Sequence, residues 1–432
     1  MKRSYRPIKA AETAPRIRPK PVAALVERDL TVVDIGARGD ATAEGPDGPI
    51  YLPYALPGEK VRARIGGDRG DVLAVLEPSP ERVTPPCPHF GRCGGCQLQH
   101  WAEEPYLAWK REQVARALAK RGIGGPVEPI VRAWGQGRRR ATLHAARGRF
   151  GFIALGGAAI VPVEQCPVLS PALVAALPAL KLIGALFSAT RGDLNLQVLA
   201  SETGLDVNVK GAGKVAAFDS ARLADAARVA QEHDFARLSF DGEPFITHRA
   251  PFVVMGRAHI TPPPGAFVQP TAEGERVLAA LALEAVAGAE RVADLFSGIG
   301  TFALRIAEQA ETQAVEGEDA MLAALKLAAE HAEGLKPVSI LRRDLLRTPL
   351  SALELKRFDA IVFDPPRSGA RLQAEQIAKS KARKVAAVSC DPATFARDAK
   401  VLLDAGFELA KITPVDQFRW SPHIEIVGAF ER

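Results

Sequence analysis

The amino-acid sequence predicts an α/β protein in which a doubly wound parallel sheet follows a small β-barrel and a central mixed region. From residue 263 onward, short apolar strands alternate with helical segments, the pattern of a parallel sheet covered by helices on both faces. A glycine-rich turn near residue 298 joins one of these strands to the next helix. Residues 23–76 instead contain short apolar runs separated by turn clusters such as G-A-R-G-D and G-G-D-R-G, which indicates an all-β unit.

The chain has the length and composition of a globular protein with several domains. Its 432 residues, 47% hydrophobic and 25% charged, predict roughly two to four domains. We find no uninterrupted apolar run long enough to cross a membrane, and the basic N-terminus lacks the apolar core of a secretory signal. We therefore expect a cytoplasmic protein without a membrane span. The net charge of +6 is compatible with a nucleic-acid partner.

Four segments follow from the positions of turns, linkers and charges. We expect a basic disordered tail at residues 1–21, a barrel of OB type at 22–79, a central region at 80–262 and the α/β sheet at 263–432. The tail could touch RNA or only solubilise the chain. In the central region, residues 105–121 read as a basic helix, and the arginines at 138–140 precede a hairpin with nearby aromatic residues. This combination suits single-stranded nucleic acid.

The glycine turn lies in D-L-F-S-G-I-G-T-F-A-L, from Asp294 to Leu304. Gly298 and Gly300 carry no side chains, so a ligand can approach the backbone closely. The pattern does not match G-x-G-x-x-G, and Glu316 ends the next strand, where an acid can bind a ribose. This pairing suits a nucleoside ligand without a pyrophosphate, such as S-adenosylmethionine. An ordinary β-α turn is the alternative.

Several chemically active residues fall at the carboxyl ends of the expected strands, where ligands bind in such sheets. These residues are Asp294, Glu316, Asp344, Asp364 and Cys390. The two prolines after Asp364 stiffen its loop, so its side chain is presented rigidly. N-methyltransferases that act on amino groups carry an aromatic residue after a similar Asp-Pro-Pro. Here Arg367 follows, which disfavours that chemistry.

Cys390, in V-S-C-D-P, stands where an enzyme would place a nucleophile. Carbon 5 of uracil is a poor nucleophile, but addition of a thiolate at carbon 6 forms an enolate that can attack a methyl sulfonium. A base must then remove the proton on carbon 5, and Glu425 is a candidate. The alternative for Cys390 is a buried structural cysteine, and the alternative for Glu425 is an exposed residue of a strand.

Four of the five cysteines lie in the first half of the chain, as Cys87, Cys93, Cys96 and Cys166. In a cytoplasmic protein this grouping indicates a metal or cluster site and not disulfides. Four thiolates suit zinc and an iron–sulfur cluster equally by geometry, and Gly94 and Gly95 allow backbone N–H groups to turn toward sulfur.

The motifs D-L-F-S-G-I-G-T-F-A-L, D-P-P-R, V-S-C-D-P-A-T-F and V-D-Q-F-R-W-S-P-H-I-E together resemble the RNA 5-methyluridine methyltransferases. The resemblance extends over residues 85–100, the cysteine segment, which contains three of the four cysteines. It also covers the N-terminal barrel, which is similar to a TRAM domain. It implies a central iron–sulfur domain, followed along the chain by a Rossmann-like methyltransferase domain that uses S-adenosylmethionine. It implies Cys390 as nucleophile and Glu425 as base. The cofactor contacts it implies are Gln269, Phe296, Thr301, Glu316, Asp344 and Asp364.

The same resemblance favours a 4Fe–4S cluster on the four cysteines, as in the branch that modifies 23S ribosomal RNA, with a structural role in the RNA-binding region. The chain departs from the family at three places. Asp391 replaces the usual Asn after the nucleophile, and its charge should raise the pKa of Cys390. Lys326 to Ala329 stand where the family often has Asn-Ala, and Ser297 replaces a common cysteine.

We therefore expect a monomeric enzyme that binds RNA and methylates carbon 5 of a uridine in ribosomal RNA, with the target base flipped out of its helix or loop. Transfer RNA is the alternative substrate. A cytosine-C5 methyltransferase would also need a cysteine nucleophile, but Cys390 is preceded by serine and so is not part of a Pro-Cys motif. A cluster-bearing RNA-binding protein without catalysis is the remaining alternative, and the presence of Cys390, Glu425 and Glu316 argues against it.

Overall fold

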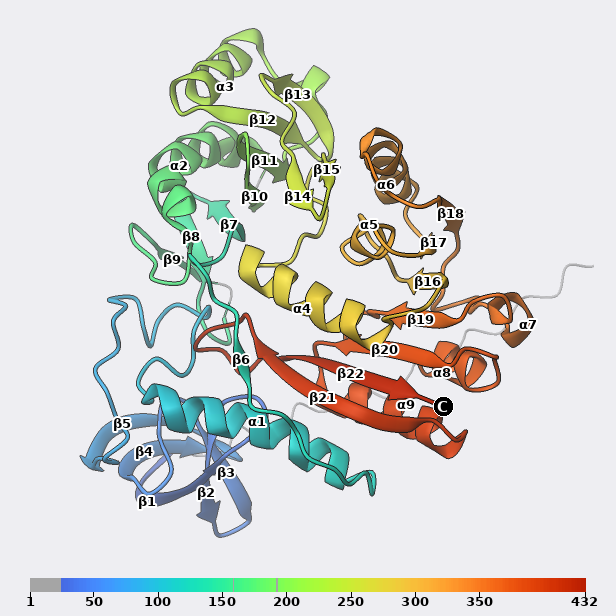
Figure 1. Ribbon diagram of the computed structural model, residues 1–432. Helices are drawn as coiled ribbons and strands as arrows, with labels where there is room; N and C mark the ends of the chain where they lie inside the picture. The colour runs from blue at the N-terminus through green and yellow to red at the C-terminus, as the bar shows by residue number, and fades with distance from the viewer. Residues whose placement is uncertain (1–24, 158, 192) are drawn as a thin grey trace, which may run out of the picture. The chain divides into compact units, whose positions relative to one another are not determined.

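The computed structural model describes residues 25–157, 159–191 and 193–432 (Figure 1). The described residues divide into two compact units, one made of residues 25–35 with 40–79 and the other of residues 36–39 with the described part of 80–432. The expected basic tail at residues 1–21 lies outside the described residues.

The first unit contains a closed barrel of five strands in the order β1-β2-β3-β5-β4. The strands are β1 (Val26–Ile35), β2 (Ala41–Gly45), β3 (Gly48–Leu52), β4 (Lys60–Gly66) and β5 (Arg69–Glu77). Along β4, buried and exposed residues alternate, as expected for a strand with one face in the barrel core. The buried carboxylate of Glu59 accepts hydrogen bonds from the N–H groups of Leu56 and Ser79, which ties the loop before β4 to the end of the barrel. The expected small barrel is confirmed.

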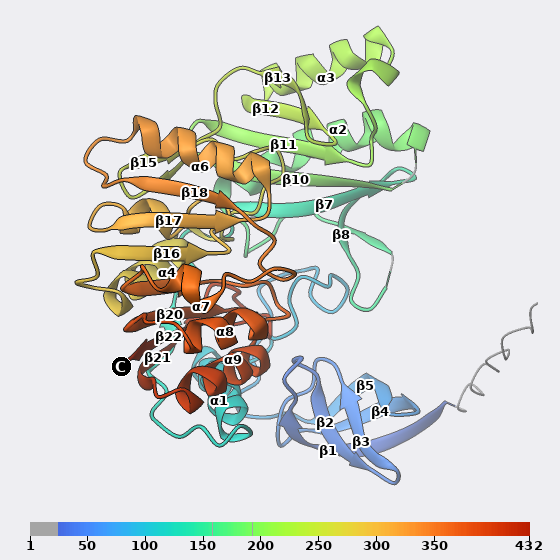
Figure 2. The same ribbon diagram turned by 90° about the vertical axis from the view of Figure 1, so that its right-hand side faces the viewer.

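The central part of the second unit is a seven-stranded sheet in the order β13-β12-β11-β10-β7-β8-β9. Its strands are β7 (Arg140–Ala146), β8 (Arg149–Ile153), β9 (Ile160–Pro162), β10 (Leu194–Ser201), β11 (Gly204–Lys210), β12 (Phe235–Phe240) and β13 (Glu243–Thr247). Helices α2 (Pro171–Arg191) and α3 (Ser220–Glu232) pack on this sheet, as Figure 2 shows. A short hairpin of β14 (Val253–Met255) and β15 (Ala258–Ile260) follows and packs on α6 (Asp319–His331).

Helix α2 is strongly apolar, as the mainly apolar segment from Ala172 to Leu186 in the sequence predicts. Its stretch Pro171–Ser188 reaches the length and mean hydropathy of a membrane-spanning helix, at 1.7, but half of it is buried inside the protein. Leu180 and Ile183 are fully buried against the central sheet. The helix is therefore part of the core of this region, which agrees with the packing and needs no membrane.

The C-terminal part is an eight-stranded sheet in the order β18-β17-β16-β19-β20-β22-β21-β6. Its strands are β6 (Val131–Arg132), β16 (Arg291–Leu295), β17 (Glu311–Glu316), β18 (Val338–Arg342), β19 (Ala360–Phe363), β20 (Lys384–Ser389), β21 (Glu408–Asp416) and β22 (Glu425–Glu431). Strands β16 to β20 are parallel, whereas β22 runs antiparallel between β20 and β21. The expected doubly wound sheet is confirmed, and its two antiparallel contacts and the strand β6 were not expected.

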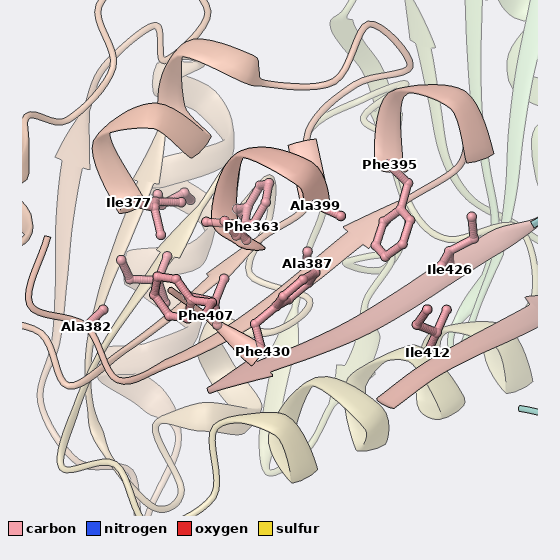
Figure 3. Packing of buried hydrophobic residues seen from close by; sticks show 14 of the residues in the cluster. Phe363, Ile377, Ala382, Ala387, Phe395, Ala399, Phe407, Ile412, Ile426 and Phe430 are labelled. Atoms are coloured by element: carbon pink, nitrogen blue, oxygen red, sulfur yellow. The ribbon is translucent and has the colours of Figure 1, made fainter. Parts of the chain in front are cut away.

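Helices cover both faces of this sheet. They are α1 (Glu103–Ala119), α4 (Ala272–Ala285), α5 (Ala303–Ile306), α6, α7 (Ala352–Leu355), α8 (Arg371–Ala378) and α9 (Pro392–Asp404). On one face α1, α8 and α9 pack over the strands, with Phe363, Phe395 and Phe430 in the shared core (Figure 3). On the other face α4 and α5 pack over alternate residues of the same strands, such as Val362 and Val388. Successive residues of each strand therefore serve two separate cores.

We expect Ile183→Ala to destabilise the central region by about 2–5 kcal/mol, because it opens a cavity at a fully buried position of α2. The neighbouring Leu182 is 49% exposed, so Leu182→Ala should change the stability by less than about 1 kcal/mol. Urea denaturation followed by circular dichroism measures both variants. Equal effects of the two substitutions would show that α2 does not bury the face described here.

Candidate active site

The carboxyl edge of the C-terminal sheet gathers the residues expected to be catalytic. Cys390 directly follows β20, and Asp364 directly follows the neighbouring β19. Because β22 is antiparallel, its first residue, Glu425, lies at the same edge, and the pairing of Ser389 with Ile426 sets it opposite Cys390. The structure thus brings together a thiol and two carboxyl groups from three strands.

Burial raises the pKa values of all three groups at this edge. Glu425 is 5% exposed, and burial raises its pKa to about 8, with a further contribution from Asp364, while a hydrogen bond from Gln417 opposes the shift. Burial also raises the pKa of Asp364 to about 7. Burial raises the pKa of the Cys390 thiol to about 11, and the charges of Glu425 and Asp364 add to this, whereas Arg367 lowers it. The thiol therefore holds its proton at neutral pH.

Asp391 does not act as expected from the sequence. Its carboxylate caps helix α9 and accepts hydrogen bonds from the N–H groups of Ala393 at 2.9 Å and Thr394 at 3.0 Å. The groups that raise the pKa of Cys390 are Glu425 and Asp364, after burial itself. Asn and Asp serve equally well as N-caps, so Asp391 fulfils a structural role that the usual Asn can also fill.

The glycine turn after β16 has the backbone that a close ligand approach requires. Gly298 and Gly300 have φ of +54° and +99°, and a Cβ on Gly300 would lie 2.9 Å from the side chain of Leu325. Phe296, at φ +62°, also adopts a left-handed conformation, which is uncommon outside glycine. Glu316 holds this turn, because its carboxylate accepts the N–H of Gly298 at 3.0 Å.

Asp294, the second-last residue of β16, has a structural role beside the glycine turn. It is fully buried, and Oδ2 accepts the N–H of Ala303 at 2.8 Å, which anchors the first residue of α5. Burial raises its pKa well above the usual value. Its Oδ1 has no hydrogen-bond partner among the described residues.

Two further expected cofactor contacts, Gln269 and Thr301, are joined by a buried ion triad. Glu275 on α4 pairs with Arg139 and with Arg305, the latter at 2.8 Å. Arg139 Nε donates to the carbonyl of Gln269 at 3.3 Å, and Arg305 donates to the carbonyl of Thr301 at 2.8 Å. Glu275 thus fixes the glycine turn and the segment before α4 relative to one another.

Asp344 stands apart from the buried group. Its side chain is 55% exposed and accepts the N–H of Leu346 at 3.1 Å in the turn after β18. It nevertheless lies at the strand end next to Glu316, since a Cβ on Gly317 would meet its Cα at 3.7 Å.

The three arginines at 138–140 are not all available to RNA, as the sequence had suggested. The expected hairpin is present as β7 and β8, but Arg139 is buried in the triad with Glu275. Arg138 lies 5.7 Å from the ring centroid of Phe418, and Arg140 lies 5.1 Å from that of Phe267, which is 51% exposed. Arg140 with Phe267 keeps the combination of charge and aromatic surface that suits a nucleobase.

The four N-terminal cysteines line one cavity of about 210 Å³, together with Phe90, Gln99 and Arg138. The N–H of Gly95 faces Cys93 Sγ at 3.5 Å, and Gln99 accepts the N–H of Cys87 at 3.2 Å. Burial raises the pKa of Cys96 to about 12, and it raises the pKa of Cys93 and of Cys166. In the part of the chain that the structure describes, no group of three or more His, Cys, Asp or Glu side chains forms a metal site.

Three polar residues of this site were missed by sequence reasoning. Lys110 belongs to the helix that the sequence predicts to be basic, but it is 1% exposed and pairs with Asp416 at 2.6 Å. Gln417 is 1% exposed and hydrogen-bonds Glu425 at 3.2 Å. Asp416 and Gln417 lie within the motif V-D-Q-F, and their position directly before an aromatic residue at a strand end was the available signal.

Comparisons with known proteins find a matching family model and relatives that match most of the chain. A family model described as tRNA (Uracil-5-)-methyltransferase matches residues 252–431. An uncharacterized RNA methyltransferase of Caulobacter vibrioides is 47% identical over 414 residues, covering 94% of this chain and 100% of that protein. The 23S rRNA (uracil(1939)-C(5))-methyltransferase RlmD of Vibrio vulnificus is 30% identical, covering 89% of this chain and 91% of that protein.

Among solved structures, the tRNA (uracil-54, C5)-methyltransferase of Pyrococcus abyssi in complex with S-adenosyl-L-homocysteine has the same fold. The TM-score is 0.74 at 22% identity, covering 93% of this chain and 99% of that chain.

We expect Glu425→Gln to lower the pKa of Cys390, because the substitution removes a negative charge that disfavours the thiolate. At pH 9 the carboxyl group is ionised, since its pKa is about 8, so iodoacetamide should alkylate Cys390 roughly threefold faster or more in the variant. Peptide mass spectrometry follows this cysteine separately from the other four. Glu431→Gln, at the exposed far end of β22, should leave the rate unchanged. An unchanged rate in Glu425→Gln would show that its carboxylate does not face the thiol.

Proposed function

The chain belongs to the RNA uracil-C5 methyltransferase family, and on this premise we propose that it methylates one uridine of 23S ribosomal RNA through a covalent adduct with Cys390. It is a methyltransferase that uses S-adenosylmethionine. The observation that carries the proposal is the meeting of Cys390, Glu425 and Asp364 at one strand edge, beside the glycine turn.

The proposed reaction assigns one step to Cys390 and one to Glu425. The Cys390 thiol gives its proton to solvent water, and its sulfur forms a bond to carbon 6 of the uracil, so that the electrons of the double bond between carbons 5 and 6 move toward carbon 5. Carbon 5 then takes the methyl group from the sulfonium, whose electron pair stays on sulfur. The Glu425 carboxylate removes the proton on carbon 5, the double bond between carbons 5 and 6 reforms, and the thiolate leaves. A pKa of about 8 lets Glu425 both accept and return a proton near neutral pH.

The cofactor residues of this proposal surround the glycine turn. Glu316 would bind the ribose hydroxyls, and Phe296 and Thr301 would form the wall of the turn. Gln269 and Asp364 would line the side near Cys390. Gln269 contacts Gln417, the partner of Glu425, and the charge of Asp364 acts on the Cys390 thiol. Asp344, at the neighbouring strand end, would reach the adenine side of the ligand.

The four cysteines fit the proposal of a 4Fe–4S cluster. Cys87, Cys93, Cys96 and Cys166 share one cavity, and backbone N–H groups of Gly95, Val168 and Leu169 face the sulfur atoms of Cys93 and Cys166. Hydrogen bonds of this kind stabilise sulfur ligands of a cluster. A cluster there would tie the cysteine segment to residues 166–169 and would take no part in methyl transfer.

Ribosomal RNA is proposed over transfer RNA for two reasons. The relative from Vibrio vulnificus named for 23S rRNA matches over most of both chains, and the four cysteines favour that branch by resemblance. The RNA would bind the face that carries Arg140 and Phe267. We further propose that the protein acts as a monomer in the cytoplasm.

We expect the wild-type protein to transfer labelled methyl groups from S-adenosylmethionine to 23S rRNA, but not to tRNA, when both come from a strain lacking its gene. Cys390→Ala should abolish the transfer and leave the affinity for S-adenosylhomocysteine within about threefold, because the thiol attacks the base and does not hold the cofactor. Scintillation counting and calorimetry measure the two effects. Labelling of tRNA alone would overturn the ribosomal assignment, and substantial turnover by Cys390→Ala would overturn the nucleophile.

We expect the anaerobically purified protein to be brown and to contain about four irons per chain. Cys93→Ser should lose the iron and lower the melting temperature, since metal binding is coupled to folding. Cys390→Ala is the matched control and should keep its iron. Elemental analysis and the visible spectrum give the result, and a colourless protein with one zinc would contradict the cluster.

A further inference from the structure

We infer that Gln417 is a positioning residue for Glu425, and that a buried network of Lys110, Tyr106 and Asp416 fixes Gln417 in place. Helix α1 and the cysteine segment would thereby govern the release of the methylated base, and not the transfer of the methyl group. The inference rests on the proposed role of Glu425 as the general base.

Gln417 follows the last residue of β21 and is almost completely buried. Its Nε2 donates two hydrogen bonds, one to Glu425 Oε1 at 3.2 Å and one to Gln269 Oε1 at 2.8 Å. The amide therefore sets the orientation of the base carboxylate relative to the residue expected to contact the cofactor. Gln417 thus donates a hydrogen bond to Glu425, whose charged neighbours include the carboxyl group of Asp364 and the guanidinium of Arg367.

The backbone on both sides of Gln417 is held by groups from α1. The fully buried carboxylate of Asp416 accepts from Lys110 Nζ at 2.6 Å and from the Tyr106 hydroxyl at 2.8 Å. Lys110 also donates to the carbonyl of Phe418 at 3.1 Å, and the N–H of Phe418 donates to Asp416 at 2.9 Å. Contacts to residues 416 and 418 therefore hold the backbone of Gln417 on both sides.

The cysteine segment holds the next part of the same loop. The carbonyl of Trp420 accepts the N–H groups of Gln97 at 2.9 Å and Leu98 at 3.0 Å, directly after Cys96. The N–H of Trp420 donates to the Tyr106 hydroxyl at 2.9 Å. Tyr106 therefore links Asp416 and Trp420, and the loop from β21 to Glu425 is anchored at both points.

These contacts affect the second half of the proposed reaction, in which the carbon-5 proton is removed and the base is released from Cys390. In the step they affect, the proton on carbon 5 passes to the Glu425 carboxylate, the electrons of its bond form the double bond to carbon 6, and the electrons of the carbon–sulfur bond return to Cys390 as thiolate. Attack by Cys390 and methyl transfer precede this step and need no proton transfer to Glu425, and Gln417 bears on the cofactor only through its hydrogen bond to Gln269. Displacement of Glu425 should therefore trap the methylated RNA on the protein.

The test is a rapid-quench experiment with labelled S-adenosylmethionine and RNA, read on a denaturing gel as methyl groups transferred and as protein–RNA adduct. Glu425→Gln is the reference, and it should transfer one methyl group and remain joined to RNA through Cys390. We expect Gln417→Leu to transfer its first methyl group within about threefold of the wild-type rate and to release the product at least about tenfold more slowly. Gln309→Leu, at an exposed position, should behave as wild type.

Tyr106→Phe and Lys110→Met extend the test to the network. Tyr106→Phe keeps the ring and removes only the hydroxyl, so it remains informative should Lys110→Met fail to fold. We expect adduct to accumulate in Tyr106→Phe, and not in Lys120→Met at the exposed end of α1. Normal release in both Gln417→Leu and Tyr106→Phe, or an equal loss of methyl transfer and release, would overturn the inference. Absence of an adduct in Glu425→Gln would overturn the assignment of the base itself.

Discussion

The candidate active site depends on one strand that runs against its neighbours. In a parallel sheet, the first residues of all strands lie at the edge opposite to the ligand site. Strand β22 is antiparallel to β20, so its first residue, Glu425, reaches the carboxyl edge at which Cys390 leaves the sheet. Its pairing with β21 also brings Val415 opposite Glu425, which places Gln417 within reach of the carboxylate. A shift of this register by one residue would turn the side chain of Glu425 to the other face of the sheet.

Burial of this edge raises the pKa of both Glu425 and Cys390, but the effects on their reactivity are opposite. Loss of water raises the pKa of Glu425 to about 8, which suits a group that must accept a proton near neutral pH. The same burial, with the charges of Glu425 and Asp364, raises the pKa of Cys390 to about 11 and keeps the thiol unreactive. A nucleophile that stays protonated in the absence of RNA is protected from alkylation and oxidation. The carboxylates that complete the reaction therefore also restrain its first step.

The sequence predicted those parts of the fold that local patterns determine. Alternation of strands and helices identified the sheet, and strand ends identified Asp364 and Cys390, because both signals lie within a few residues. The sequence did not reveal that Lys110, in the predicted basic helix α1, is buried. The partner of Lys110 is Asp416, more than three hundred residues away, and no local pattern reports such a pairing. Arg139 was misjudged for the same reason, since its partner Glu275 belongs to a distant helix.

The two missed pairs share a feature with a third, between Arg237 and Asp206 in the central sheet, where Arg237 also donates to the carbonyl of Pro262 at 2.7 Å. Each joins a charged side chain to a backbone carbonyl as well as to a carboxylate, and each lies in or beside a segment that connects two parts of the second unit. Buried ion pairs add little net stability, because desolvation offsets most of their attraction. Their geometry is strict, however, because a buried arginine or lysine that loses its partner becomes a charge that neither a carboxylate nor water stabilises. The pairs therefore act mainly on orientation: apolar cores hold the sheets together, and these charges decide where the connecting segments that carry Gln269 and Gln417 must lie.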